Sequence, residues 1–148
     1  MLNVPLLHVD KSCQELDDNA ITQLCRSLHG QSPLSLNLSG NRFSSRGVLA
    51  IINFLKVCGS IENLDFAYND VNDTGIDYIA EFSESDQNLS VLKFQSISIR
   101  SFGLFRLANS LTSNKSLHNV FISSIFDISS CWNYLTQSIL ENEAIHYI

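Results

Sequence analysis

A chain of 148 residues is long enough for one packed domain, and a content of 45% hydrophobic and 16% charged residues excludes a disordered protein. The formal net charge is −6 and the few lysine and arginine residues are scattered, which argues against a nucleic-acid partner. No apolar run approaches the roughly 20 residues of a membrane span. The start, MLNVPLLHVDK, also lacks the features of a signal peptide. The sequence therefore predicts a single domain over residues 1–148 with no membrane partner.

The cysteines, Cys13, Cys25, Cys58 and Cys131, form no CxxC pair and no regular framework. Free, partly buried thiols are the simpler interpretation, and disulfides remain the alternative. Because free thiols are typical of a reducing compartment, we expect an intracellular, cytoplasmic protein.

The sequence repeats with a period of 28 residues. One apolar column contains Leu36, Leu64, Leu92, Val120 and Ile148, and a second column contains Leu38, Phe66, Phe94 and Ile122. The period predicts repeats at about 34–61, 62–89, 90–117 and 118–145, after a degenerate repeat at about 6–33 and before a partial strand at 146–148. A fixed period of this length indicates a solenoid.

The degenerate first repeat matches the others if one residue is deleted. Its segment LHVDKSCQELDDNAITQLCRSL then places Val9 in the column of Leu36 and Leu16 in that of Phe43. The apolar positions of its expected helix are Ile21, Leu24, Cys25 and Leu28.

Each later repeat combines a strand with a helix. The alternating L-x-L pattern predicts a short strand with every second residue inward. After Gly47 the apolar residues Val48, Ile51, Ile52 and Leu55 follow helical spacing, and similar stripes follow Gly75, Gly103 and Cys131. One strand and one helix cannot bury their apolar faces alone, so the units must stack.

The pattern LxLxxNxF, followed by a glycine and an amphipathic helix, resembles leucine-rich repeats of the ribonuclease-inhibitor type over roughly residues 6–148. The resemblance implies an α/β solenoid, a curved horseshoe segment with a parallel sheet on its concave face and helices on its convex face. It also implies that Asn41 and Asn69 form a hydrogen-bond ladder between turns. Ile97 and Ile125 stand in the later asparagine positions, which indicates either repeat drift or a changed surface.

No residue pattern points to catalysis, a metal or a cofactor. The histidines form no HExxH pair and complete no zinc spacing with the cysteines. The acidic stretch DVNDTGID lacks calcium-loop spacing, and there is no G-x-S-x-G or phosphate loop. We therefore expect no enzyme and no cofactor.

Strand positions between the core positions are free for function. The candidates for partner binding on the concave face are Asn37, Asn63, Asp65, Tyr68, Lys93, Gln95 and Phe121. Tyr68 and Phe121 are the candidate anchors, because aromatic side chains often dominate interface energetics. The sequence thus predicts a non-catalytic protein-interaction module or assembly subunit.

Two alternatives remain open. The protein could regulate a partner enzyme, for example as a GTPase activator using Arg42 and Arg46, or the chain could be a fragment of a longer repeat protein. Ile145 and Ile148 continue the apolar columns without a polar cap, so we also expect an assembly edge there. A homo-oligomer or larger complex would then form through Ile145, Tyr147 and Ile148.

Overall fold

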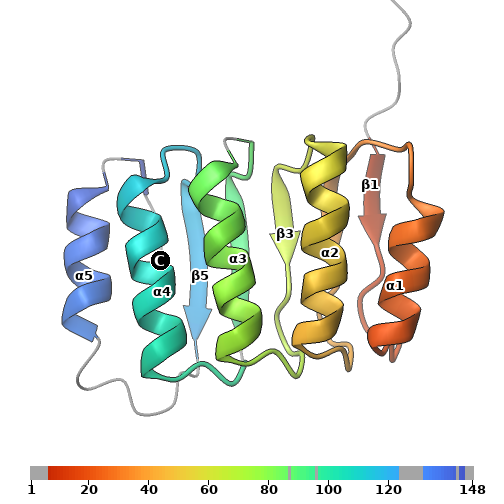
Figure 1. The fold of residues 1–148 in the computed structure, drawn as a ribbon, viewed down its shortest axis with the longest axis horizontal. Coiled ribbons are helices and arrows are strands. Elements are labelled where there is room, and N and C mark those ends of the chain that lie inside the picture. Colours follow the sequence, from red (N-terminus) through yellow and green to blue (C-terminus); the bar gives the residue numbers. More distant parts are fainter. Residues whose placement is uncertain (1–6, 87, 96, 124–131, 143, 146–148) are drawn as a thin grey trace, which may run out of the picture.

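The computed structural model describes residues 7–86, 88–95, 97–123, 132–142 and 144–145. In these residues five strands alternate with five helices along the chain (Figure 1). The strands are β1 (Leu7–Asp10), β2 (Pro33–Asn37), β3 (Asn63–Asp65), β4 (Val91–Gln95) and β5 (Asn119–Ser123). The helices are α1 (Asp18–Ser27), α2 (Ser45–Cys58), α3 (Asp73–Ser85), α4 (Ser101–Ser113) and α5 (Trp132–Glu141).

The strands form one parallel sheet in the order β1-β2-β3-β4-β5. The helices lie side by side on one face of that sheet (Figure 1). This arrangement confirms the predicted α/β solenoid of stacked strand–helix units. We call the sheet face turned away from the helices the strand face.

The strand register follows the apolar columns of the sequence. Leu64 of β3 lies opposite Leu36 on one side and Leu92 on the other, and Leu92 lies opposite Val120. In the first repeat Val9 lies opposite Leu36, which is the pairing that the one-residue deletion predicts. Residues 146–148, the predicted partial strand, lie outside the described residues.

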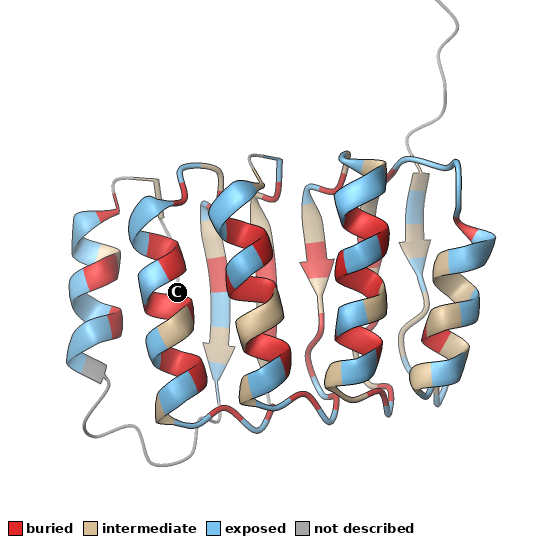
Figure 2. Ribbon diagram, viewed as in Figure 1, coloured by how far each residue is buried: buried red, intermediate tan, exposed pale blue. Residues whose placement is uncertain are grey.

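The core lies between the sheet and the helices. Buried residues recur along α2, α3 and α4 and in the strands behind them (Figure 2). The largest fully buried side chains are Phe43, Phe66 and Phe94, and the rings of Phe43 and Phe66 meet edge to face at 6.0 Å. Burial of these rings is a main source of stability, because each aromatic removes a large apolar area from water.

Helix starts are fixed partly by the preceding repeat. The carboxylate of Asp18 in α1 accepts hydrogen bonds from the backbone N–H groups of Ser44 and Gly47 at the start of α2. A Cβ atom on Gly47 would lie 2.9 Å from that same Asp18 oxygen and 2.8 Å from Cβ of Phe43. The glycine column therefore reflects the close approach of the previous repeat to each helix N-terminus.

The implied asparagine ladder is present in the turns after β2 and β3. The Asn41 side-chain amide donates to the carbonyls of Lys11 and Leu38, both at 2.8 Å. The Asn69 amide donates to the same Leu38 carbonyl at 2.9 Å, so neighbouring turns share an acceptor. The later position Ile97 is buried and apolar, whereas Ile125 lies outside the described residues.

A second polar ladder occupies the opposite end of the repeats, after the helices. The Asn114 amide donates to the Ser83 carbonyl at 2.6 Å, and its oxygen accepts from the backbone N–H of Leu117 at 2.7 Å. Asn142, 28 residues later, donates to the Asn114 carbonyl at 2.7 Å. Both side chains are buried, so these bonds satisfy groups that water cannot reach.

Candidate interaction surface

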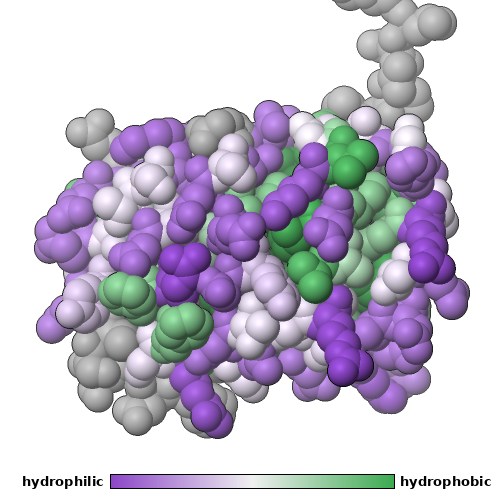
Figure 3. Space-filling view, in the orientation of Figure 1, coloured by the Kyte–Doolittle hydropathy of each residue, from purple (hydrophilic) through white to green (hydrophobic). Residues whose placement is uncertain are grey.

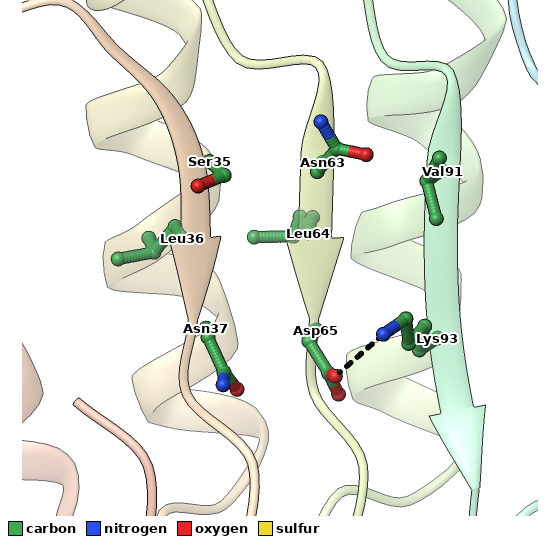
Figure 4. Close-up of a pocket in the computed structure, with 8 residues that line it drawn as sticks. All are labelled: Ser35, Leu36, Asn37, Asn63, Leu64, Asp65, Val91 and Lys93. Atoms are coloured by element: carbon green, nitrogen blue, oxygen red, sulfur yellow. Dashed lines mark ion pairs between the residues drawn. The ribbon is translucent and has the colours of Figure 1, made fainter. Parts of the chain in front are cut away.

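The strand face carries the candidate partner-binding side chains. Six lie on strands, namely Asn37 on β2, Asn63 and Asp65 on β3, Lys93 and Gln95 on β4, and Phe121 on β5. Tyr68 lies in the turn that follows β3. Figure 4 shows Asn37, Asn63, Asp65 and Lys93 projecting from three adjacent strands. Alternate residues of neighbouring parallel strands form rows on one face of a sheet.

A shallow hollow of about 220 Å³ lies on this face over β2, β3 and β4. Its lining residues are Ser35, Leu36, Asn37, Asn63, Leu64, Asp65, Val91 and Lys93. Cavities that bind small molecules are usually larger, from about 300 to 1,000 Å³. The hollow therefore suits contact with side chains of a macromolecule better than enclosure of a small ligand.

A charged row crosses three strands of the strand face. Lys93 Nζ lies 3.4 Å from Asp65 Oδ2, and the same ammonium lies 5.8 Å from the centre of the Phe121 ring (Figure 4 for the ion pair). The lysine thus connects a carboxylate on β3 with an aromatic ring on β5. The sequence predicted these three residues on one face, but it did not indicate that they contact each other.

Turns of one type hold several polar side chains of this face in place. Asn37 and Asp65 each accept a hydrogen bond from the backbone N–H two residues further along, at Ser39 and Ala67. Asp10 accepts in the same way from Ser12, whose backbone N–H and then hydroxyl lower the pKa of the Asp10 carboxyl. These side chains are ordered before any partner arrives, which reduces the entropy lost on binding.

Tyr68 has a backbone conformation that favours glycine. Its φ is 57°, and the matching turn positions Cys13 and Gly40 have φ values of 53° and 68°. A non-glycine residue in this left-handed region costs about 1–2 kcal/mol. The backbone N–H of Tyr68 donates to the Gln95 carbonyl at 2.8 Å, which holds the turn, while the residue remains 58% exposed.

The remaining candidates from the sequence are the C-terminal assembly edge and Arg42. Ile145 is half-buried and packs against the hydrophobic core, whereas Tyr147 and Ile148 lie outside the described residues. Arg42 forms an exposed ion pair with Glu15 at 2.9 Å.

Within the described ranges, no cluster of three or more His, Cys, Asp and Glu residues is arranged to hold a metal ion. No helix of the described part has the length and apolar character needed to cross a membrane. Cys13, Cys25 and Cys58 are free thiols, and Cys131 lies outside the described residues.

Two features of the structure were not predicted from the sequence. The first is the ladder of Asn114 and Asn142. The 28-residue spacing of these two asparagines could have indicated it, but both lie outside the strand-turn motif. The second feature is a groove between α1 and α2 on the helical face. Its sequence signal is Ala50, a small residue at a repeat position that is larger in the later repeats.

These features define a solenoid protein built from strand–helix repeats. A family model described as Leucine Rich repeat matches residues 34–51 and 58–80. These residues therefore match leucine-rich repeats, and they lie within the stacked strand–helix units described above. The chain is 29% identical over 120 residues to the human (Homo sapiens) NACHT, LRR and PYD domains-containing protein 13, and the alignment covers 80% of this chain.

A solved structure shares the fold. The structure of "Leiomodin-1 Actin-Binding Site 2 (ABS2)" aligns with a TM-score of 0.76 over 91% of this chain and 79% of that one, at 18% identity. That identity supports a common fold and nothing finer. The aligned part of the human relative is 12% of that protein's length.

Proposed function

We propose that this protein is a non-catalytic interaction module that binds a protein partner through its strand face. The observation that carries the proposal is the exposed Tyr68, which occupies a turn position where the left-handed backbone favours glycine. Strained residues persist where the surrounding structure holds them, and they concentrate at functional sites. An exposed tyrosine held in this way is suited to anchor a partner.

Phe121 supplies the second anchor. This residue is 37% exposed on β5, and the ammonium of Lys93 lies over its ring. On the same face, Asn63 on β3 and Gln95 on β4 offer amide groups. Two aromatic anchors together with polar groups match the usual composition of a protein-binding surface.

The likenesses support a protein partner of this kind. The similar solved structure is named as an actin-binding site of leiomodin-1, and leucine-rich repeats are also part of the name of the human relative. Neither likeness names the partner of this chain. We further propose that the repeats belong to the ribonuclease-inhibitor type, since each of the three repeats from α2 to α4 carries a full helix after its strand.

Regulation of a partner enzyme is the second candidate. It would use Arg42 and Arg46, near the start of α2, to stabilise charge in another protein's active site. Because Arg42 already forms an ion pair with Glu15, its guanidinium has less freedom to reach a partner protein. Stimulation of hydrolysis across a panel of small GTPases, lost on Arg46→Ala, would favour this candidate over simple binding.

Binding by variants tests the main proposal. The wild-type chain is used to retain binding proteins from an extract of the native source, and these proteins are identified. The affinity of each variant for the identified partner is then measured. We expect Tyr68→Ala combined with Phe121→Ala to weaken binding at least about tenfold, a loss of about 1.4 kcal/mol. The matched control, Phe102→Ala with Leu140→Ala, removes two exposed apolar side chains from α4 and α5. Loss of binding in the control alone would reject the strand face as the binding surface.

A further inference from the structure

One column of the repeats lies on the helices at positions equivalent to Ala50. Its members, 28 residues apart, are Ala50 on α2, Tyr78 on α3, Arg106 on α4 and Tyr134 on α5. Arg106 bonds Asp77 of the preceding helix α3 and lies 3.8 Å from Glu84. The Tyr134 ring contacts Phe105 of the preceding helix α4, edge to face, with centres 5.7 Å apart. Tyr78 is half-buried and packs against the core.

Ala50 is the small member of this column, and a groove is open beside it. The cavity between α1 and α2 measures about 530 Å³. Its lining residues are Thr22, Cys25, Arg26, His29, Ala50, Asn53, Phe54 and Val57. A second cavity of about 190 Å³ shares His29, Phe54 and Val57, so the groove continues past the end of α1. Figure 3 shows apolar side chains gathered over these two helices.

The groove has an apolar floor. Ala50 and Phe54 line it from α2, and Cys25 lines it from α1. Burial raises the pKa of the Cys25 thiol to about 11, so the thiol stays neutral at physiological pH. Val57 is 74% exposed at the side of the groove. An apolar floor with an exposed apolar edge gains free energy when a partner side chain covers it.

The rim of the groove is basic. Arg26, in the last turn of α1, and His29, just beyond that helix, both line it. Among the ion pairs between described residues, Arg26 takes part in none. In a chain of net charge −6, an arginine without such a pair beside an apolar groove favours a carboxylate on whatever enters.

We propose that the groove between α1 and α2 binds an aromatic side chain of a protein partner, presented by a segment that carries an acidic residue close to the aromatic one. The molecule itself shows what fits, because the equivalent groove position holds a tyrosine on α3 and on α5. The acidic neighbour would meet Arg26. This site lies on the helical face and is independent of the strand-face function.

A phage-displayed library of random 12-residue peptides tests the proposal directly. The library is panned on the wild-type chain and counter-selected on Ala50→Tyr, which fills the groove with the side chain found at positions 78 and 134. We expect enriched peptides to contain an aromatic residue within a few positions of Asp or Glu. Their affinity should fall at least about tenfold on Ala50→Tyr and on Arg26→Glu.

Matched variants separate the groove from general effects. Leu140→Tyr adds the same phenol ring to an exposed position on α5 and should leave peptide affinity unchanged. If Ala50→Tyr fails to fold, Val57→Lys places a charge at the exposed edge of the groove and serves as the counter-selection variant. Peptides without an aromatic or acidic residue, or no peptides that distinguish the wild type from the groove variants, would overturn the proposal.

Discussion

The two halves of the solenoid are joined by different polar ladders. In the N-terminal repeats, Asn41 and Asn69 connect adjacent turns after the strands. In the C-terminal repeats, Ile97 replaces that asparagine, and Asn114 and Asn142 connect adjacent turns after the helices. Stacked repeats leave buried backbone groups in both sets of turns, and an asparagine can satisfy them at either end. A lost asparagine in one turn therefore does not mean a lost connection between repeats.

The halves also differ on the helical face. Arg106 and Tyr134 contact the preceding helix, α3 and α4 respectively, whereas a groove lies open beside Ala50 in front of α2. The backbone repeat is the same in each case. The size of one side chain per repeat thus differs between the grooves of the two halves.

The largest expected effect concerns a feature that both halves share, the column of buried apolar residues in the strands. Leu64 is 1% exposed in the central strand, between Leu36 and Leu92. We expect Leu64→Ala to lower the free energy of unfolding by about 2–5 kcal/mol, as for other large-to-small core substitutions. Denaturant unfolding measures this change. A loss below about 0.5 kcal/mol would contradict the role of this column in the core.

Substitution of the ladder asparagines tests the difference between the halves. Asn41→Ala removes bonds to three carbonyls and two backbone N–H groups, and Asn114→Ala removes bonds to two carbonyls and two backbone N–H groups. Since each buried group left unpaired costs about 1–3 kcal/mol, both variants should be clearly destabilised in thermal or denaturant unfolding. The exposed Asn109→Ala is the control. Equal stability of Asn114→Ala and the wild type would show that the second ladder does not hold the C-terminal repeats.

Substitution of a glycine at a helix start tests whether that start is constrained by the preceding repeat. A Cβ on Gly103 would lie 2.7 Å from the Asp73 carboxylate of the preceding helix. We expect Gly103→Ala to cost about 1–3 kcal/mol through overpacking. In an Asp73→Ala background the cost should be smaller, and a double-mutant cycle measures the coupling. Purely additive effects would mean that the close approach is not what requires glycine.

Strand register and the stripes of buried helix residues could be predicted from the sequence, because both follow directly from the 28-residue period. The contact of Lys93 with Asp65 and Phe121 could not, since it depends on which way a long side chain turns. The left-handed backbone of Tyr68 could have been inferred from Gly40 in the same column. The open groove was harder to predict, because an alanine at one repeat position looks like ordinary drift.

The smallest expected effect on stability concerns Tyr68. Glycine fits the left-handed turn without strain but loses more entropy on folding, so the two contributions oppose each other. We expect Tyr68→Gly to change the free energy of unfolding by no more than about 1 kcal/mol while it weakens partner binding. Strong destabilisation would instead assign the tyrosine a structural role.

Site-specific photo-crosslinking tests the central claim most directly. A benzoylphenylalanine replaces Tyr68 or Phe121 on the strand face, or Leu140 on α5 as the control, and each full chain is irradiated in an extract of the native source. If the strand face binds the partner, the two strand-face positions capture the same protein and position 140 does not. Capture of that protein from position 140 alone would contradict binding through the strand face.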